Sequence, residues 1–147
     1  MKPSVYTEII CALLVLLFLY TALSKLSDFD SFRGMLERSP LIGRYSVIVV
    51  WVLPVSELIV TALLLAPGWK LAGLYASLVL LLLFTGYLLY ILVFQSQHLP
   101  CSCGGVLRKM TWKQHLVFNL FFIALCIAGI KQREKIKNTT YPGGLIT

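Results

Sequence analysis

Charged residues are scarce in this sequence of 147 residues: 13% are Asp, Glu, Lys or Arg, and 59% are hydrophobic. A soluble domain would carry about twice that charged fraction, so the composition excludes an ordinary soluble domain and indicates an integral membrane protein. The formal net charge is +7. Since no basic stretch is interleaved with aromatic residues in a soluble segment, we assign this excess to the lipid headgroups and not to a nucleic acid.

Four long segments are almost free of charge, and each contains the roughly 20 apolar residues that cross a bilayer as a helix. We predict them at residues 5–23, 45–66, 71–94 and 111–130. Short connections predict antiparallel neighbours. The sequence therefore predicts an all-α integral membrane four-helix bundle of residues 1–130, in contact with the lipid bilayer, and a basic, flexible cytoplasmic tail of residues 131–147.

Local signals mark the boundaries of these spans. Pro67-Gly68 predicts a tight turn, and Thr111 with Gln114 matches a capping box at the start of the fourth span. Between the first two spans, residues 28–38 place apolar side chains on one helical face and charged side chains on the other. This pattern predicts a short amphipathic surface helix in the first outer loop. It is either a connector or a lid over the cysteines described below.

The orientation follows from basic residues and from thiol chemistry. Four basic residues crowd the C-terminal tail and favour a cytoplasmic C-terminus, although the two loops at the other end carry seven and the basic residues of the two sides are nearly balanced. Paired cysteines work as a disulfide in an oxidising outer compartment. We therefore expect both termini in the cytoplasm and the third connection on the outer side.

The third connection contains two thiols one residue apart, Cys101 and Cys103, in what we name the cysteine segment (residues 100–105). A disulfide across one intervening residue is strained and easily reduced. Gly104 and Gly105 leave the sulfurs open to a partner, Pro100 stiffens the entry, and Arg108 is close enough in sequence to stabilise a thiolate. The pair is suited to redox exchange, to a structural disulfide, or to holding a soft metal.

The metal alternative needs more ligands. His98, Cys101, Cys103 and His115 together form a set that suits copper(I) or zinc. The spacing differs from that of common zinc modules, which have two residues between the cysteines. Each histidine is therefore better explained by a structural role.

The other two cysteines lie inside predicted spans. Cys11 belongs to the first span and Cys126 to the fourth, far along the helices from the cysteine segment. A buried cysteine is usually a small apolar core residue, which is the role that we expect for both. A second redox pair is the alternative if these two spans touch.

Glu57 is the one ionisable residue deep inside a predicted span. A carboxylate in the membrane is costly unless it is paired or protonated, and it is a functional candidate for that reason. Lys25, at the end of the first span, can reach toward it. Glu57 is expected to handle protons or contact a cofactor, or else to lock the first two spans together through a hydrogen bond.

Three motifs together resemble a known family. Leu23-Ser24-Lys25-Leu26-Ser27-Asp28-Phe29, Leu53-Pro54-Val55-Ser56-Glu57-Leu58 and Cys101-Ser102-Cys103-Gly104-Gly105 are similar to motifs of the MauE family within the DoxX-like group. The resemblance covers nearly the whole chain. Gly104 departs from it, since the family usually has an aromatic residue there.

The resemblance implies a role in thiol redox chemistry in the bacterial inner membrane. It implies that Cys101 and Cys103 are the catalytic pair, that the cysteine segment is periplasmic, and that an exported thioredoxin-like protein or a larger membrane complex is the partner. Glu57 and Lys25 match family positions without a settled role. A quinone cofactor follows only by analogy with other four-helix thiol oxidoreductases, whose Cys-x-x-Cys pair this chain lacks.

Our hypothesis is therefore a membrane thiol–disulfide redox protein, an oxidoreductase that passes electrons to or from an exported thioredoxin-like partner. One alternative is a non-enzymatic membrane scaffold or assembly subunit. The other is a membrane protein that handles copper or zinc. The sequence identifies neither the substrate protein nor the electron carrier.

Overall fold

The computed structural model describes residues 3–94 and 111–140, and all regular structure within these residues is helical. The elements are α1 (Pro3–Ser27), α2 (Phe29–Glu37), a 3₁₀ turn η1 (Gly43–Tyr45), α3 (Ser46–Leu65), α4 (Lys70–Phe94) and α5 (Trp112–Thr140). The predicted all-α class is confirmed.

Four of these helices are long and apolar enough to cross a bilayer, over Val5–Ser27, Gly43–Leu65, Lys70–Phe94 and Lys113–Thr139. With 25 residues, α1 is about 37 Å long at the α-helical rise, and a bilayer's hydrocarbon core is about 30 Å thick. Large apolar side chains such as Leu16, Leu83 and Val93 are exposed on the outer faces. The predicted four-helix membrane bundle in contact with lipid is confirmed.

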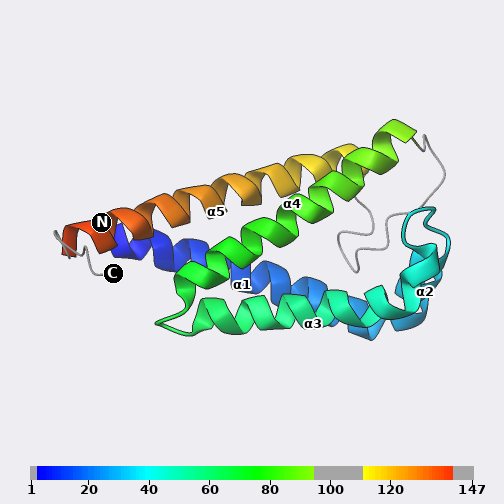
Figure 1. Ribbon diagram of the computed structural model, residues 1–147, viewed down its shortest axis with the longest axis horizontal. Helices are drawn as coiled ribbons and strands as arrows, with labels where there is room; N and C mark the ends of the chain where they lie inside the picture. Colours follow the sequence, from blue (N-terminus) through cyan, green and yellow to red (C-terminus); the bar gives the residue numbers. More distant parts are fainter. Residues whose placement is uncertain (1–2, 95–110, 141–147) are drawn as a thin grey trace, which may run out of the picture.

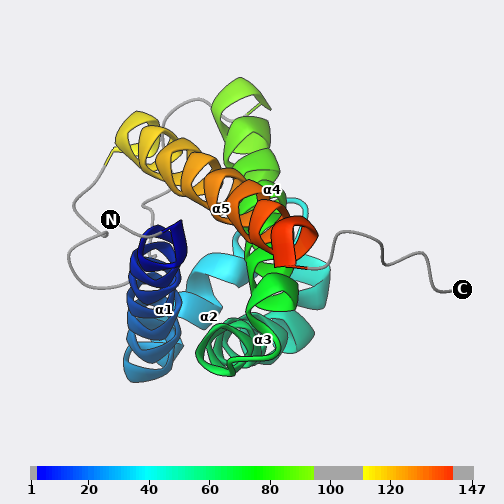
Figure 2. The ribbon, with the colours of Figure 1, turned by 90° about the vertical axis from the view of Figure 1, so that its left-hand side faces the viewer.

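The four spans form two pairs that diverge toward one end. α1 packs against α3 and α5, α4 packs against the same two helices, and α1 and α4 barely touch. In Figures 1 and 2, α4 and α5 rise away from α1 and α3 toward the end of the bundle that carries α2. The start of α1 and the end of α5 lie together at the opposite end (Figure 1).

The core is continuous where the pairs converge. Its buried side chains come from all four spans, and they include both cysteines of the described residues, Cys11 and Cys126. Gly129 lets both α1 and α4 pack closely against α5, because a Cβ there would lie 3.3 Å from side chains of Ile10 and Leu74. Helix association in lipid depends on such close packing, since the bilayer supplies no hydrophobic driving force between spans.

The predicted surface helix is present as α2. Phe32 and Leu36 are buried against Val50 of α3, while Arg33 and Glu37 form an exposed ion pair of 2.9 Å on the other face. This division explains the amphipathic pattern of residues 28–38, because the apolar side chains anchor α2 on the end of the bundle.

The capping box at the start of α5 is confirmed. The Thr111 backbone N–H donates to Gln114 Oε1 (3.0 Å), and the Gln114 N–H donates to Thr111 Oγ1 (3.4 Å). These reciprocal bonds satisfy two of the amides that a helix start leaves without partners. The residue types therefore fix where the fourth span begins.

The end of α5 differs from the prediction. We expected a flexible tail from residue 131, but the helix continues through Thr140. The segment after residue 130 is rich in Lys, Gln, Arg and Glu, which have high helix propensity. Glu134 also accepts a hydrogen bond from Tyr75 of α4 (2.6 Å). Residues 141–147 lie outside the described residues.

The tight turn after α3 brings α3 and α4 into close contact at Gly73. A Cβ at this position would lie 2.9 Å from the backbone nitrogen of Leu64. We expect Gly73→Ala to lower the free energy of unfolding by about 1–3 kcal/mol, because the two backbones must separate. Denaturation by sodium dodecyl sulfate in mixed micelles measures this loss.

Gly86→Ala is the matched control on the same helix, since a Cβ there meets nothing within 4 Å. It should leave stability unchanged or raise it slightly, as Ala is a better helix former than Gly. Equal losses for the two variants would contradict the close approach of α3 and α4.

Candidate functional site

The end of α1 and the middle of α3 are joined by a buried ion pair. Lys25 Nζ lies 2.7 Å from Glu57 Oε1, and the two side chains are only 5% and 10% exposed. A charge inside a membrane span is costly, and charges placed there usually pair with one another. The sequence indicated that Lys25 can reach Glu57, and the structure confirms this contact.

Lys25 also contacts a third element. Its Nζ donates to the backbone carbonyl of Thr21, one turn earlier on α1 (3.5 Å), and lies 5.9 Å from the centre of the Phe32 ring of α2. A cation over an aromatic ring is attracted by the ring's electrons, more strongly when water is excluded. Lys25 therefore contacts three helices: its own helix α1, α2 and α3.

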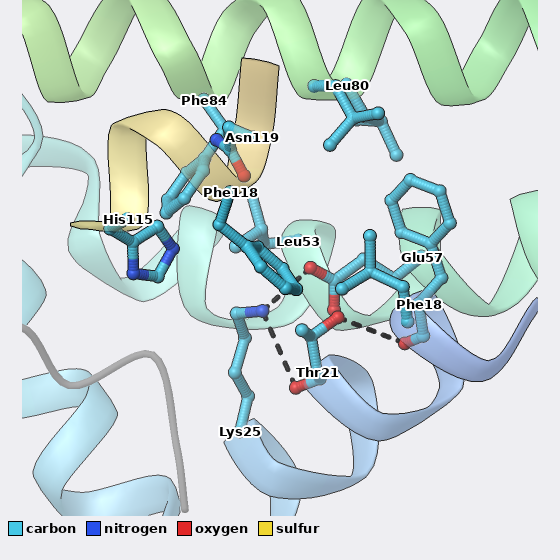
Figure 3. Close-up of a pocket in the computed structure, with 12 residues that line it drawn as sticks. Phe18, Thr21, Lys25, Leu53, Glu57, Leu80, Phe84, His115, Phe118 and Asn119 are labelled. Carbon is cyan, nitrogen blue, oxygen red and sulfur yellow. Dashed lines mark hydrogen bonds and ion pairs between the residues drawn. The ribbon is translucent and has the colours of Figure 1, made fainter. Parts of the chain in front are cut away.

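The ion pair faces a cavity of about 70 Å³ between the four spans (Figure 3). Its walls are mostly aliphatic and aromatic, and its polar groups come from α1, α3 and α5. The lining residues are Leu17, Phe18, Thr21, Lys25, Leu53, Glu57, Leu80, Leu81, Phe84, His115, Phe118 and Asn119. The cavity is therefore an apolar pocket with a few converging polar side chains, the usual composition of a binding site.

Two polar side chains of α5 complete the pocket. His115 and Asn119 are four residues apart, so they share one face of the helix, and they are 3% and 4% exposed. His115 presents its ring to Phe84 in an edge-to-face arrangement with centroids 5.4 Å apart. Asn119 Nδ2 donates to Thr85 Oγ1 of α4 (3.4 Å). α5 thus contributes both hydrogen-bonding groups and a link to α4.

The second oxygen of the Glu57 carboxylate has no partner among the described residues. Oε2 is buried and accepts no hydrogen bond from them, while Oε1 takes the bond from Lys25. A buried acceptor without a donor costs free energy. A ligand that donates a hydrogen bond to Oε2 would therefore gain binding free energy at this atom.

Only some of the predicted site residues lie within the described part of the chain. Lys25, Glu57 and His115 meet at the pocket, which the sequence did not predict for His115. The other predicted residues lie outside the described residues: His98, Pro100, Cys101, Cys103, Gly104, Gly105 and Arg108. In the parts of the chain that are described, no three His, Cys, Asp or Glu side chains are grouped to hold a metal ion.

Cys11 and Cys126 are free thiols, 3% and 0% exposed. Their helices α1 and α5 touch, and both side chains belong to the same apolar core cluster. This burial agrees with the expectation that they serve as small core residues.

Sequence reasoning missed Thr21, Phe84, Phe118 and Asn119 as pocket residues. A signal was present for two of them, because Thr21 precedes Lys25 by one turn and Asn119 follows His115 by one turn. Polar residues repeated at this spacing mark an interior face of a span. Nothing in the sequence distinguishes the two phenylalanines from those that face lipid.

The fold and the pocket define a class: a four-span helical membrane protein with a buried ion pair beside an interior cavity. Within that class the relation is more specific, because the family described as "Methylamine utilisation protein MauE" matches residues 3–132. The chain belongs to the MauE family. No curated protein and no solved structure matches it.

Replacing one partner of the ion pair should lower the free energy of unfolding more than replacing both partners. We expect Lys25→Met to lower the free energy of unfolding by about 3–5 kcal/mol, because Glu57 is left buried without its partner. The double variant Lys25→Met/Glu57→Leu should recover most of this loss, since no charge is then left in the core. Denaturation in mixed micelles measures both.

Lys70→Met is the control, because Lys70 pairs with Glu8, whose side chain is 54% exposed. An exposed ion pair contributes about 1 kcal/mol or less. If Lys25→Met costs no more than Lys70→Met, or if the double variant is the least stable of all, the buried pair does not support the fold.

Proposed function

We propose that this MauE-family protein is a membrane thiol–disulfide oxidoreductase that exchanges electrons with an exported thioredoxin-like partner through Cys101 and Cys103. The observation that carries the proposal is the Cys-x-Cys sequence between α4 and α5. The helix ends that flank it lie at the end of the bundle that carries α2, where the spans diverge (Figure 1). His115, in the first turn of α5, already lines the pocket.

The proposed exchange is balanced within the two proteins. A thiolate of the reduced partner attacks one sulfur of the Cys101–Cys103 disulfide, and the other sulfur leaves as a thiolate that takes up a proton. The partner's second thiolate then attacks the mixed disulfide. The partner ends as a disulfide and the pair as a dithiol, after transfer of two electrons and two protons. The reverse sequence reduces the partner.

The remaining predicted residues have supporting roles in this proposal. Gly104 and Gly105 leave the disulfide open to attack, Pro100 restricts the approach of the chain, and the positive charge of Arg108 stabilises a thiolate. Glu57 exchanges protons with the thiol chemistry, and Lys25 positions it. The proposed orientation has both termini in the cytoplasm and the cysteine segment in the periplasm of a bacterial inner membrane.

The pocket does not fit a quinone. Its volume is about 70 Å³, whereas an engineered cavity that binds benzene measures roughly 150 Å³. A quinone ring is at least as large as benzene, so the described side chains leave too little room for it. We assign no step of the exchange to a quinone in this pocket.

Single replacement of either loop cysteine should trap the partner. In a chain that also carries Cys11→Ser and Cys126→Ser, we expect Cys101→Ser or Cys103→Ser to give a covalent adduct that reducing agent releases. The mixed disulfide persists because the resolving thiol is absent. The adduct is detected by mobility on non-reducing gels of membranes quenched with acid.

The chain with all four cysteines replaced is the control, and it should insert normally and form no adduct. Absence of an adduct from both single variants would contradict the proposal. Redox titration with a membrane-impermeant maleimide then distinguishes the alternatives. A pair that titrates between roughly −270 and −120 mV behaves as a thioredoxin-like couple, whereas one that stays oxidised far below this range is a structural disulfide of a scaffold subunit.

A further inference from the structure

We infer that the pocket beside Lys25 and Glu57 is a hydrated site within the membrane, where bound water donates to Glu57 Oε2 and exchanges protons with the carboxylate. The inference starts from the unpartnered oxygen. The Glu57 side chain is nine-tenths buried and lines the cavity, and Oε2 accepts no hydrogen bond from the described residues. The site therefore favours a ligand that donates a hydrogen bond.

The side-chain donors of the pocket make hydrogen bonds to other acceptors. Lys25 Nζ donates to Glu57 Oε1 and to the Thr21 carbonyl. The Thr21 hydroxyl lies within hydrogen-bonding reach of both the Phe18 carbonyl (3.1 Å) and the Glu57 carboxylate, and its single proton serves one of them at a time. Asn119 directs an amide proton to Thr85. Among the described residues no hydrogen bond to Oε2 is made, so a bound molecule can supply the donor that this oxygen lacks.

The size of the cavity identifies the class of that molecule. A water molecule needs roughly 10–15 Å³ of such volume, so about 70 Å³ accommodates several. It is too small for a ring, as shown above. Buried waters usually make about three hydrogen bonds, and the lining supplies suitable groups in Glu57, His115 and Asn119. Water is the ligand that fits both the volume and the chemistry.

Partly exposed side chains in the lining give water access to the pocket. The pocket lies beside Lys25, which also contacts Phe32 of α2. Thr21 and Phe118 line it and are partly exposed, in contrast with the closed core around Leu14 and Cys126 at the other end. Lys25, Glu57 and His115 all line the pocket, so bound water is in reach of all three side chains.

This hydration has a chemical consequence. A carboxylate that contacts water takes a proton from a hydronium ion and returns it to water, and the hydrogen bond that Lys25 Nζ donates to Oε1 favours the ionised state. Only its link to thiol chemistry rests on the proposed function, in which oxidation of the dithiol releases two protons. The hydration itself does not depend on Cys101 or Cys103.

Water-edited solid-state NMR of the full chain in lipid bilayers tests this directly. Magnetisation is transferred from mobile water to the carbons of the labelled chain, among them the carboxylate carbons of the four glutamates and the cysteine side-chain carbons. We expect the Glu57 signal to rise nearly as fast as that of exposed Glu37 and several-fold faster than signals of buried Cys126. Glu57→Gln assigns the resonance, and connectivity to Ser56 assigns it if that variant fails to insert.

A filled-cavity variant is the second test. Leu80→Phe adds volume to the lining and should slow the transfer to Glu57 several-fold by displacing water. Leu82→Phe, which makes the same change on an exposed face of α4, should have no effect. A Glu57 signal in the native chain that rises as slowly as Cys126 would overturn the inference. The Cys101→Ser/Cys103→Ser chain should remain hydrated, so a dry pocket and an inactive cysteine pair are distinguishable failures.

Discussion

The contact between Lys25 and Glu57 is the constraint on which the described part of this protein depends. Two opposite charges lie within a membrane bundle, and each makes the presence of the other tolerable. Because Lys25 also reaches the Phe32 ring, the same contact positions α2 on the end of the bundle. Burying these two charges costs free energy. The fold is stable despite this cost because the other end of the bundle is closely packed around Leu14, Leu74 and Cys126. The bundle thus divides into a tightly packed half and a half that holds the polar pocket.

The division between the two halves also explains how a chain with so few polar groups can support chemistry. The packed half keeps the spans together through small residues and core contacts, as at Gly73 and Gly129. The diverging half leaves room for Glu57, His115 and Asn119 to face a common cavity. In the proposed function, thiol exchange occurs in the segment between α4 and α5, and the pocket supplies the proton chemistry. The two roles are separable, which allows each to be tested alone.

Much of this architecture follows from the sequence. Hydropathy predicts the four spans, and Thr111 with Gln114 predicts the start of α5. Glu57 stands out in the sequence as the one carboxylate deep in a predicted span, and Lys25 is the partner that can reach it. The convergence of His115 and Asn119 on that pair depends on how α5 rotates against three other helices, which no local pattern encodes. The continuation of α5 beyond residue 130 was missed because charge indicates the end of a membrane span and not the end of a helix.

The most direct measurement is the distance between the Lys25 Nζ nitrogen and the Glu57 carboxylate carbon in lipid bilayers. Dipolar recoupling in a chain labelled with ¹⁵N-lysine and ¹³C-glutamate gives this distance, and Lys25→Met identifies the contributing pair. The structure predicts a strong coupling, consistent with a nitrogen–oxygen separation of 2.7 Å. A coupling so weak that the nitrogen and oxygen must lie beyond about 4 Å, the limit of an ion pair, would contradict the pair, the pocket built around it and the role given to Glu57.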